Sequence, residues 1–290
     1  MKTHRAKKSL GQNFLKSELA LRKIIEAGEI KKEDVVLEIG PGKGALTGKL
    51  LGTGCKVLAV EKDRELFEFL KTKFEKEIKS NTLILVCKDV LKFEASAYGL
   101  KSSAYKIIAN IPYNITGAIL KKFLAGKNQP ERMVLMVQHE VAQRIIGNSP
   151  SAAKAKAGKK ESILSISVKA YGEPKMIMKV DKRYFSPAPK VDSAIISIKN
   201  ISRKNFNSPL EEYPKGEVDE FSTPSRKQAT PQEGNFEAKF WEIVKAGFAH
   251  KRKKLSGNLK GLCQGASLTP FADKRAEDLT LADWIALTRD

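Results

Sequence analysis

Cysteine is scarce in this sequence. Its 290 residues include only Cys55, Cys87 and Cys263, an odd number at wide spacing. Such spacing offers neither the paired framework of a disulfide-rich domain nor the closely spaced ligands of a structural zinc site. We therefore predict a protein with no disulfide and no bound metal.

Long hydrophobic runs are absent as well. Runs such as Met133 to Val137 fall far short of the roughly 18 to 20 apolar residues that cross a bilayer. The basic N-terminus MKTHRAKKSLGQNFL is not followed by the apolar stretch and cleavage site of a secretory signal. No lipidation signal is visible. We therefore expect a cytoplasmic protein that does not attach to membranes.

Acidic residues are few relative to basic ones. The chain has 53 Lys and Arg against 33 Asp and Glu, a net charge of +20 at pH 7. This excess suits a polyanionic partner, because each neutralised phosphate releases condensed counterions. A basic surface that serves only solubility is the alternative.

Short apolar runs, rich in β-branched residues, recur between amphipathic segments. Such runs indicate strands covered on both faces, and the segments Ala45 to Gly54 and Asp63 to Ile78 between them are predicted to be helical. The alternation predicts an α/β fold with a parallel, doubly wound sheet. The expected strands are Val35–Ile39, Lys56–Glu61, Leu83–Cys87, Tyr105–Ala109 and Arg132–Gln138.

Two later runs, Ile163 to Ala170 and Val191 to Ile198, have no long helical segment between them, and we expect an antiparallel pair at the sheet edge. After Asn200 the composition becomes rich in Pro, Ser, Glu and Gly, which is typical of a linker. From Phe236 the apolar residues again recur at helical spacing. We predict a first domain over 1–200, a flexible linker over 201–235 and a helical C-terminal domain over 236–290.

Three glycines, Gly40, Gly42 and Gly44, lie where the first strand meets its helix, and Glu61 ends the second strand. Glycines let the backbone turn sharply and approach a ligand, and a carboxylate here can bind both ribose hydroxyls of an adenosine cofactor. NAD and S-adenosylmethionine both fit, and a turn without a ligand is the third alternative. A Walker loop does not fit, because Leu50 occupies the position of its magnesium-binding Ser or Thr.

Polar side chains also end the next two strands. Asp89 can accept the exocyclic amine of a bound adenine, or it can cap a turn. Asn110 and Tyr113 lie in "NIPYN", which adds an amide acceptor and a flat ring. Acceptors and a stacking surface are what an aromatic amine needs in order to react as a nucleophile. A turn with a packing tyrosine is the alternative.

Six motifs resemble, in order, those of the small-subunit (16S) ribosomal RNA adenine dimethyltransferases. The resemblance spans nearly the whole chain outside the linker. It implies a Rossmann-like S-adenosylmethionine-dependent methyltransferase domain and a small helical domain that binds RNA. It further implies transfer of methyl groups to two adjacent adenines in a hairpin loop of small-subunit RNA. The motifs are "SLGQNFL", "EIGPGKGALT", "VEKD", "NIPYNIT", "FSPAPKVDSAI" and "RAEDLTLADW".

The resemblance also implies a role for each matching residue. Asn13 and Leu15 would close over the cofactor, and Gly40 would line its methionine portion. Glu61 would hold the ribose and Asp89 the adenine, while Asn110 would lie between cofactor and target amine. Tyr113 and Phe185 would clamp the target base, although Phe185 has the alternative of an ordinary core residue. No metal is implied, and the expected partner is the RNA of the immature 30S particle, bound by a monomer.

Two rival functions remain open at this point. A resistance-type dimethyltransferase that acts on large-subunit RNA would share the cofactor and the "NIPY" motif. A ribosome assembly factor with incidental methylation would share the whole sequence pattern. The four cations from Lys251 to Lys254, expected to end an amphipathic helix, are predicted to contact RNA, with a solvated surface as the alternative.

Overall fold

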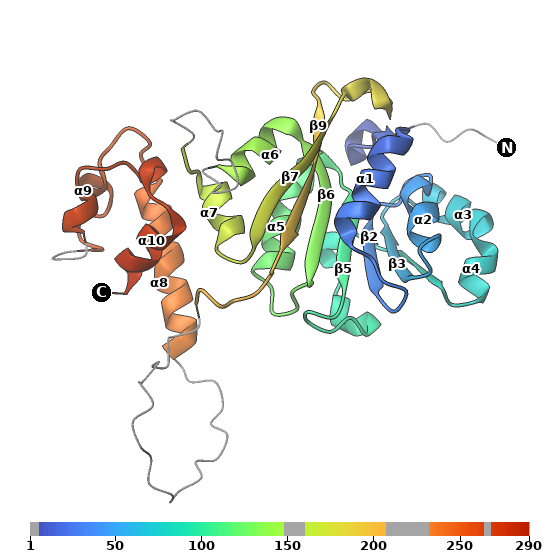
Figure 1. Ribbon diagram of the computed structural model, residues 1–290, viewed down its shortest axis with the longest axis horizontal. Coiled ribbons are helices and arrows are strands. Elements are labelled where there is room, and N and C mark those ends of the chain that lie inside the picture. Colours follow the sequence, from blue (N-terminus) through green and yellow to red (C-terminus); the bar gives the residue numbers. More distant parts are fainter. Residues whose placement is uncertain (1–5, 148–159, 207–231, 264–267, 290) are drawn as a thin grey trace, which may run out of the picture. The chain divides into compact units, whose positions relative to one another are not determined.

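The computed structural model describes the chain except for residues 1–5, 148–159, 207–231, 264–267 and 290 (Figure 1). The chain divides into two compact units, Met1–Ser149 with Ser167–Ser202, and Pro150–Ile166 with Arg203–Asp290. The division at residues 200 and 235 stays a prediction. Most of the predicted linker lies outside the described residues.

A seven-stranded sheet forms the centre of the first unit, in the order β4-β3-β2-β5-β6-β9-β7. The strands from β4 to β6 run parallel, and β9 pairs antiparallel with both β6 and β7. The prediction of a parallel sheet with an antiparallel edge pair is confirmed. The strands are β2 (Val35–Ile39), β3 (Lys56–Glu61), β4 (Leu83–Cys87), β5 (Lys106–Asn110), β6 (Arg132–Gln138), β7 (Glu173–Val180) and β9 (Ser193–Lys199).

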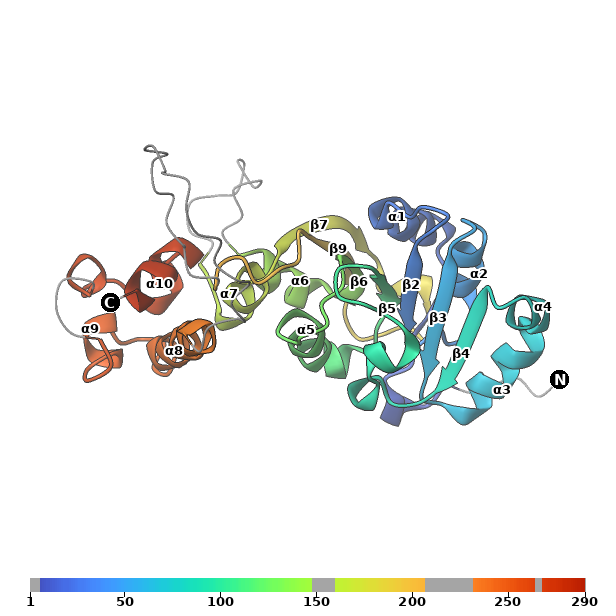
Figure 2. The same cartoon turned by 90° about the horizontal axis from the view of Figure 1, so that it is seen from below.

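Four of the predicted parallel strands match the observed ones to the residue, and β5 is displaced by one position. Strands β2, β3, β5 and β6 are mostly buried because helices cover both faces of the sheet, as Figure 2 shows for α1 and α5, whereas the edge strand β4 is partly exposed. Leu37 and Ile107 are fully buried at the β2–β5 pairing. In this part of the chain, a continuous apolar run therefore reliably indicates a parallel strand.

The residues predicted for the edge pair were partly wrong. Residues Ile163–Lys169 form helix α7, and the strand next to β9 is β7 instead. Ser162 starts the helix, because its hydroxyl accepts the Ser165 N–H at 3.1 Å while the Ser165 hydroxyl accepts the Ser162 N–H at 2.7 Å. This reciprocal cap favours a helix over the strand that the β-branched residues suggested.

The sequence of β7 hides its strand character. It begins with Glu-Pro, and its pairing with β9 slips between Met176 and Met178. Such a bulge interrupts the alternation of side chains between the two faces. The periodicity that would reveal a strand is therefore lost.

Polar caps define the starts of two helices in this unit. Ser17 accepts the Ala20 N–H at the start of α1, and Asp63 accepts the Glu65 N–H at the start of α3. Side chains of α1 and α2 pack in one apolar cluster with β2, β3 and β6. The helices are α1 (Glu18–Gly28), α2 (Ala45–Leu51), α3 (Arg64–Lys73), α4 (Glu75–Lys79), α5 (Thr116–Leu124) and α6 (His139–Ile146).

The second unit contains α8 (Gln232–Gly247), α9 (Leu255–Asn258) and α10 (Leu281–Thr288). Trp284 is fully buried and stacks on Phe248, with ring centroids 5.6 Å apart. The cations Lys251 to Lys254 do not extend a helix as predicted. They lie in the turn between α8 and α9, because α8 ends at Gly247. A Cβ at Gly247 would come within 2.3 Å of the Trp284 ring, so this position requires glycine.

Predictions from the sequence also concerned disulfides, bound metal and membrane attachment. Cys55, Cys87 and Cys263 are free thiols. No group of three or more His, Cys, Asp and Glu able to hold a metal ion occurs among the described residues. Within the same part of the chain, every helix is too short or too polar to span a bilayer.

Candidate active site

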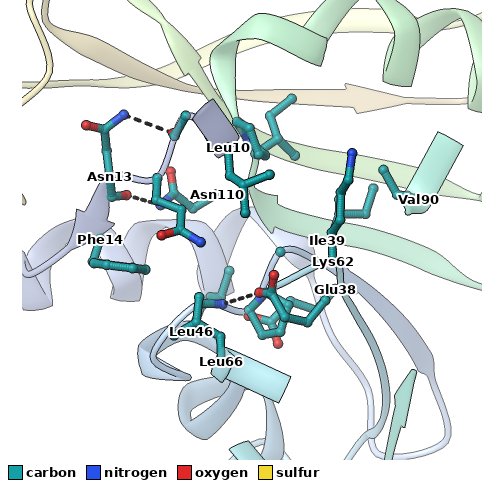
Figure 3. Close-up of a pocket in the computed structure, with 18 of the residues that line it drawn as sticks. Leu10, Asn13, Phe14, Glu38, Ile39, Leu46, Lys62, Leu66, Val90 and Asn110 are labelled. Atoms are coloured by element: carbon teal, nitrogen blue, oxygen red, sulfur yellow. Dashed lines mark hydrogen bonds between the residues drawn. The ribbon is translucent and has the colours of Figure 1, made fainter. Parts of the chain in front are cut away.

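A pocket of about 420 Å³ lies in the first unit, lined by residues that end or directly follow β2, β3, β4 and β5. The carboxyl ends of neighbouring parallel strands meet at one edge of a sheet, which explains why residues far apart in sequence converge here. Figure 3 shows this convergence for Asn13, Glu38, Lys62 and Asn110. Seven of the eight predicted site residues line the pocket: Asn13, Leu15, Gly40, Glu61, Asp89, Asn110 and Tyr113.

The glycine turn after β2 requires its glycines. Gly40, Gly42 and Gly44 have φ angles of 65°, 60° and 74°, in the left-handed region that side chains disfavour. A Cβ on Gly42 would also lie 3.0 Å from the ring of Phe14, and one on Gly44 would lie 2.5 Å from that of Phe74. The turn therefore packs closely and leaves its backbone open toward the pocket.

Glu61 ends β3 with its carboxylate held by backbone. One oxygen accepts the Gly42 N–H at 3.1 Å and the other accepts the Asp63 N–H at 2.8 Å. The residue is 5% exposed, and burial raises its pKa. Each oxygen has a second lone pair, so the carboxylate is oriented to accept two hydroxyl groups of a ligand.

A segment that we call the N-terminal strap, residues 6–15, lies along the pocket. Asp63 anchors it, because its carboxylate accepts from Lys7 Nζ at 2.8 Å and from Gln12 Nε2 at 2.9 Å. The strap ends in β1 (Phe14–Leu15), which pairs antiparallel with β8 (Phe185–Ser186). The anchoring role of Lys7 and Gln12 was missed from the sequence, since nothing local links them to Asp63.

Asn110 ends β5 and contacts the strap. Its Nδ2 donates to the backbone oxygen of Asn13 at 3.1 Å (Figure 3). This bond fixes the orientation of the amide and uses one of its two N–H donors. The amide oxygen of Asn110 remains available as an acceptor at the pocket wall.

Tyr113 follows in the short 3₁₀ helix η4 (Tyr113–Ile115). Its ring is half-buried at the pocket, and its hydroxyl is hydrogen-bonded to Ser193 Oγ. Burial raises the pKa of this phenol. Ser193 was not singled out from the sequence.

Asp89 caps the short 3₁₀ turn at Val90–Lys92, which is one of the two roles that the sequence suggested for it. One oxygen accepts the Leu91 N–H at 2.9 Å, and the other pairs with Lys62 at 2.9 Å. The Lys62 ammonium lowers the pKa of Asp89, so the carboxyl stays ionised. The residue also lines the pocket, and the cap does not prevent an oxygen from accepting a second hydrogen bond.

Phe185 is the predicted site residue that does not line the pocket. Its side chain is 2% exposed and belongs to the apolar cluster that includes Leu15, its partner across the β1–β8 pairing. The next residue, Ser186, does line the pocket. Phe185 therefore packs as a core phenylalanine, which was the alternative that the sequence analysis left open.

Glu38, in β2, is a site residue that the sequence analysis missed. It is 1% exposed and lines the pocket, and its Oε2 has no hydrogen-bond partner among the described residues. Burial above all, and the charge of Glu61 to a lesser degree, raise its pKa to about 8. The sequence did contain a signal for this site, an acidic residue inside an otherwise apolar strand, because buried acids are rare and are often functional.

The fold and this site define a class, the Rossmann-like S-adenosylmethionine-dependent methyltransferases. The sequence model of one family, "Ribosomal RNA adenine dimethylase", matches residues 3–214. The chain belongs to this family, which decides the cofactor class that the glycine turn left open. It is a dimethyltransferase rather than a nicotinamide-dependent oxidoreductase.

Curated relatives agree over nearly the whole chain. "Ribosomal RNA small subunit methyltransferase A" of Dehalococcoides mccartyi (strain CBDB1) is 36% identical over 293 residues, covering 97% of this chain and 87% of the relative. The protein of the same name from Francisella tularensis subsp. tularensis is 35% identical over 291 residues, covering 98% and 96%.

Solved structures share the fold. A dimethyladenosine transferase from Plasmodium falciparum has a TM-score of 0.70 at 24% identity, covering 94% of this chain and 95% of its own. The 23S rRNA methyltransferase ErmE has a TM-score of 0.67 at 23% identity, covering 96% and 98%. At these identities both likenesses show the fold alone and do not decide which RNA this chain modifies.

Proposed function

We propose that this dimethyltransferase modifies two adjacent adenines in a hairpin loop near the 3′ end of small-subunit ribosomal RNA, within the immature 30S particle. The curated relatives named for the small subunit support this choice, at 35% identity or more over nearly the whole chain. The observation that carries the chemistry is the Asn110 amide, whose nitrogen is bound to Asn13 and whose oxygen remains at the pocket wall. We expect a monomer that acts in the cytoplasm, where ribosomes are assembled.

The residues of the pocket fit S-adenosylmethionine. Gly40 of the glycine turn lines the pocket and would lie against the methionine portion, with its backbone in the left-handed conformation that side chains disfavour. Glu38 Oε2, which has no partner within the described part of the chain, suits the α-ammonium group, because a buried acceptor of this kind is satisfied by a cation. Glu61 would accept both ribose hydroxyls and Asp89 the adenine amine, while Asn13 and Leu15 of the strap would cover the cofactor.

When bound, the cofactor would supply an electrophilic methyl group: the N6–methyl bond would form as the sulfonium C–S bond breaks, leaving S-adenosylhomocysteine, and the N6 proton would pass to solvent. The chain contributes alignment. The Asn110 oxygen, with the backbone carbonyls of Ile111 and Pro112, would accept the N6 hydrogens and direct the nitrogen lone pair toward the methyl group. Well-aligned reactions reach effective molarities of about 10⁵ M or more, so alignment can provide most of the rate enhancement.

Tyr113 would stack on the target base, with Phe185 as the second face. Because Phe185 is 2% exposed, this second role requires its side chain to turn out of the core when RNA binds. The target adenine must leave its own stack, which is less costly in a loop than in a duplex. After the first transfer, the monomethylated amine must turn to present its remaining hydrogen.

A substrate comparison tests this function. Purified protein would be incubated with radiolabelled S-adenosylmethionine and either unmethylated immature small subunits or protein-free large-subunit RNA. We expect label at two adjacent adenines of the small-subunit hairpin and none on large-subunit RNA. Labelling of large-subunit RNA alone would identify the resistance-type activity instead.

The assembly-factor role makes a different prediction. An Asn110→Ala variant that is inactive in transfer should fail to support normal small-subunit maturation if methylation is the main role. Normal maturation with the inactive variant would show that binding and release of the particle, rather than methylation, is the main role.

A further inference from the structure

Tyr113 is anchored at both ends. Its backbone oxygen accepts from Thr116 Oγ1 at 3.0 Å, and its phenolic hydroxyl is hydrogen-bonded to Ser193 Oγ. The first contact fixes the base of the side chain and the second fixes its tip. The ring therefore cannot swing about its first torsion without breaking the hydrogen bond to Ser193, so the axis of the ring keeps one direction.

Ser193 reaches this position through the topology of the sheet. It is the first residue of β9, fully buried, and pairs with Gln138 of β6 and Val180 of β7. Because β9 runs antiparallel to β6, its first residue lies at the edge where the parallel strands β5 and β6 end. A serine 80 residues after Tyr113 therefore lies beside the tip of its ring.

The contact is difficult to replace. Ser193 is 0% exposed, so loss of the Tyr113 hydroxyl would leave its Oγ buried without that partner. A phenol is protonated at neutral pH, and burial raises the pKa of Tyr113 further, so its hydroxyl keeps the hydrogen that this contact can use.

We propose that Ser193 is a positioning residue for methyl transfer, which fixes the position of the Tyr113 ring so that the target adenine stacks in line with the methyl group. This inference rests on the stacking role proposed for Tyr113. Ser193 itself does not contact the base. Ser193 acts through the Tyr113 ring, because the transfer requires the adenine amine to be aligned as well as bound.

A double-mutant cycle tests the proposal. Single-turnover rate constants would be measured on immature small subunits at saturating S-adenosylmethionine for Ser193→Ala, Tyr113→Phe and the double variant. Each single change should lower the rate constant about 10- to 100-fold, because a small misalignment has effects of that size. The double variant should lie within about threefold of the slower single variant, because both changes remove the same bond.

Three controls separate positioning from stability. Ser193→Thr keeps a hydroxyl and should recover most of the rate. Tyr105→Phe deletes another buried phenol, whose hydroxyl donates to the Asn128 oxygen at 3.0 Å away from the site, and should leave the rate unchanged. Affinity for S-adenosylhomocysteine, measured by calorimetry, should be unchanged in every variant.

The outcomes distinguish the inference from the proposed function. A Ser193→Ala enzyme with the normal rate, or effects that multiply in the double variant, would overturn the positioning role and leave the function intact. A Tyr113→Ala enzyme with the normal rate would remove the stacking role on which both proposals depend. A loss of rate in Tyr105→Phe equal to that in Ser193→Ala would show that the effect reflects stability alone.

Discussion

The side-chain nitrogen of Asn110 donates a hydrogen bond to the backbone oxygen of Asn13, at 3.1 Å and across 97 positions of sequence. This bond joins the end of β5 to the N-terminal strap. The strap is anchored at Asp63 and at β8, so the group proposed to handle the adenine amine is connected to the segment proposed to cover the cofactor. Loss of the Asn110 side chain should therefore lower the rate of methyl transfer more than it weakens the attachment of the N-terminal strap.

Replacement of Asn110 by Ala should abolish methyl transfer, with a loss of at least about 100-fold, the size expected when one polar group that acts in a transition state is removed. Affinity for S-adenosylhomocysteine should stay within a few-fold, because the strap keeps its other anchors. Single-turnover kinetics and calorimetry measure the two effects. Normal turnover in the variant would contradict the role assigned to Asn110.

Replacement of Glu61 by Gln should weaken cofactor binding before it affects anything else. A hydrogen bond to a charged group contributes about 1.5 to 3 kcal/mol, which corresponds to a loss of about 10- to 150-fold in affinity. Calorimetric titration with S-adenosylhomocysteine measures this loss. The matched control is Glu68→Gln, an exposed acid on α3, which should bind normally. Equal affinity in both variants would exclude Glu61 as the ribose acceptor.

Glu38 should make stability depend on pH. Its pKa is about 8 in the folded protein against 4.5 for the ordinary side chain, so the folded state holds a proton that the unfolded chain releases. The free energy of unfolding should therefore fall as pH rises from about 4.5 to 8, in the direction that proton linkage requires. Urea unfolding across this range should show a smaller decline for Glu38→Gln.

The same residue offers a test of cofactor recognition. If the α-ammonium group binds Glu38, then binding near neutral pH should release a proton, because the cation favours the ionised carboxylate. Besides Glu38, the neighbouring groups are the Glu61 carboxylate on β3 and the Thr47 hydroxyl on α2. Calorimetry in buffers of different ionisation enthalpy measures the release. Identical proton release by wild type and Glu38→Gln would assign the proton to another group.

The basic turn between α8 and α9 gives a prediction about RNA binding. Lys251, Arg252 and Lys253 are exposed, whereas Lys254 is paired with Asp273 at 2.7 Å, so the change to test is Gln at the first three positions. RNA affinity should fall for all sequences alike. The salt slope should decrease by roughly 0.7 to 0.9 for each lost phosphate contact.

A charge-matched control supports that comparison. Lys56, Lys76 and Lys101 are exposed residues of the first unit, and their change to Gln removes the same charge. If both triple variants lose equal affinity, the effect is one of net charge and the turn is not a contact site. If the turn variant keeps its affinity and salt slope, the cluster is a solvated surface.

Much of the sheet could be predicted because its signals are local. A run of buried β-branched residues identifies a parallel strand, and the polar residue that ends it identifies a position at the ligand edge. Glu61, Asp89 and Asn110 were found in this way and Gly40 from the glycine turn, and all four line the pocket. The prediction at Ile163 to Ala170 was wrong because the cap formed by Ser162 and Ser165 outweighed strand propensity.

The sequence by itself determined the class of fold, the glycine turn, the acids and amides at the strand ends and the resemblance to the dimethyltransferases, since each depends on neighbouring residues. Only the tertiary structure decided which distant groups meet. Lys7 reaches Asp63, the Ser193 hydroxyl meets that of Tyr113, and Phe185 packs in the core. Glu38 is buried, and one of its oxygens has no partner among the residues that the structure describes. These relationships depend on strand order and burial, which pair residues across long stretches of chain that no local pattern connects.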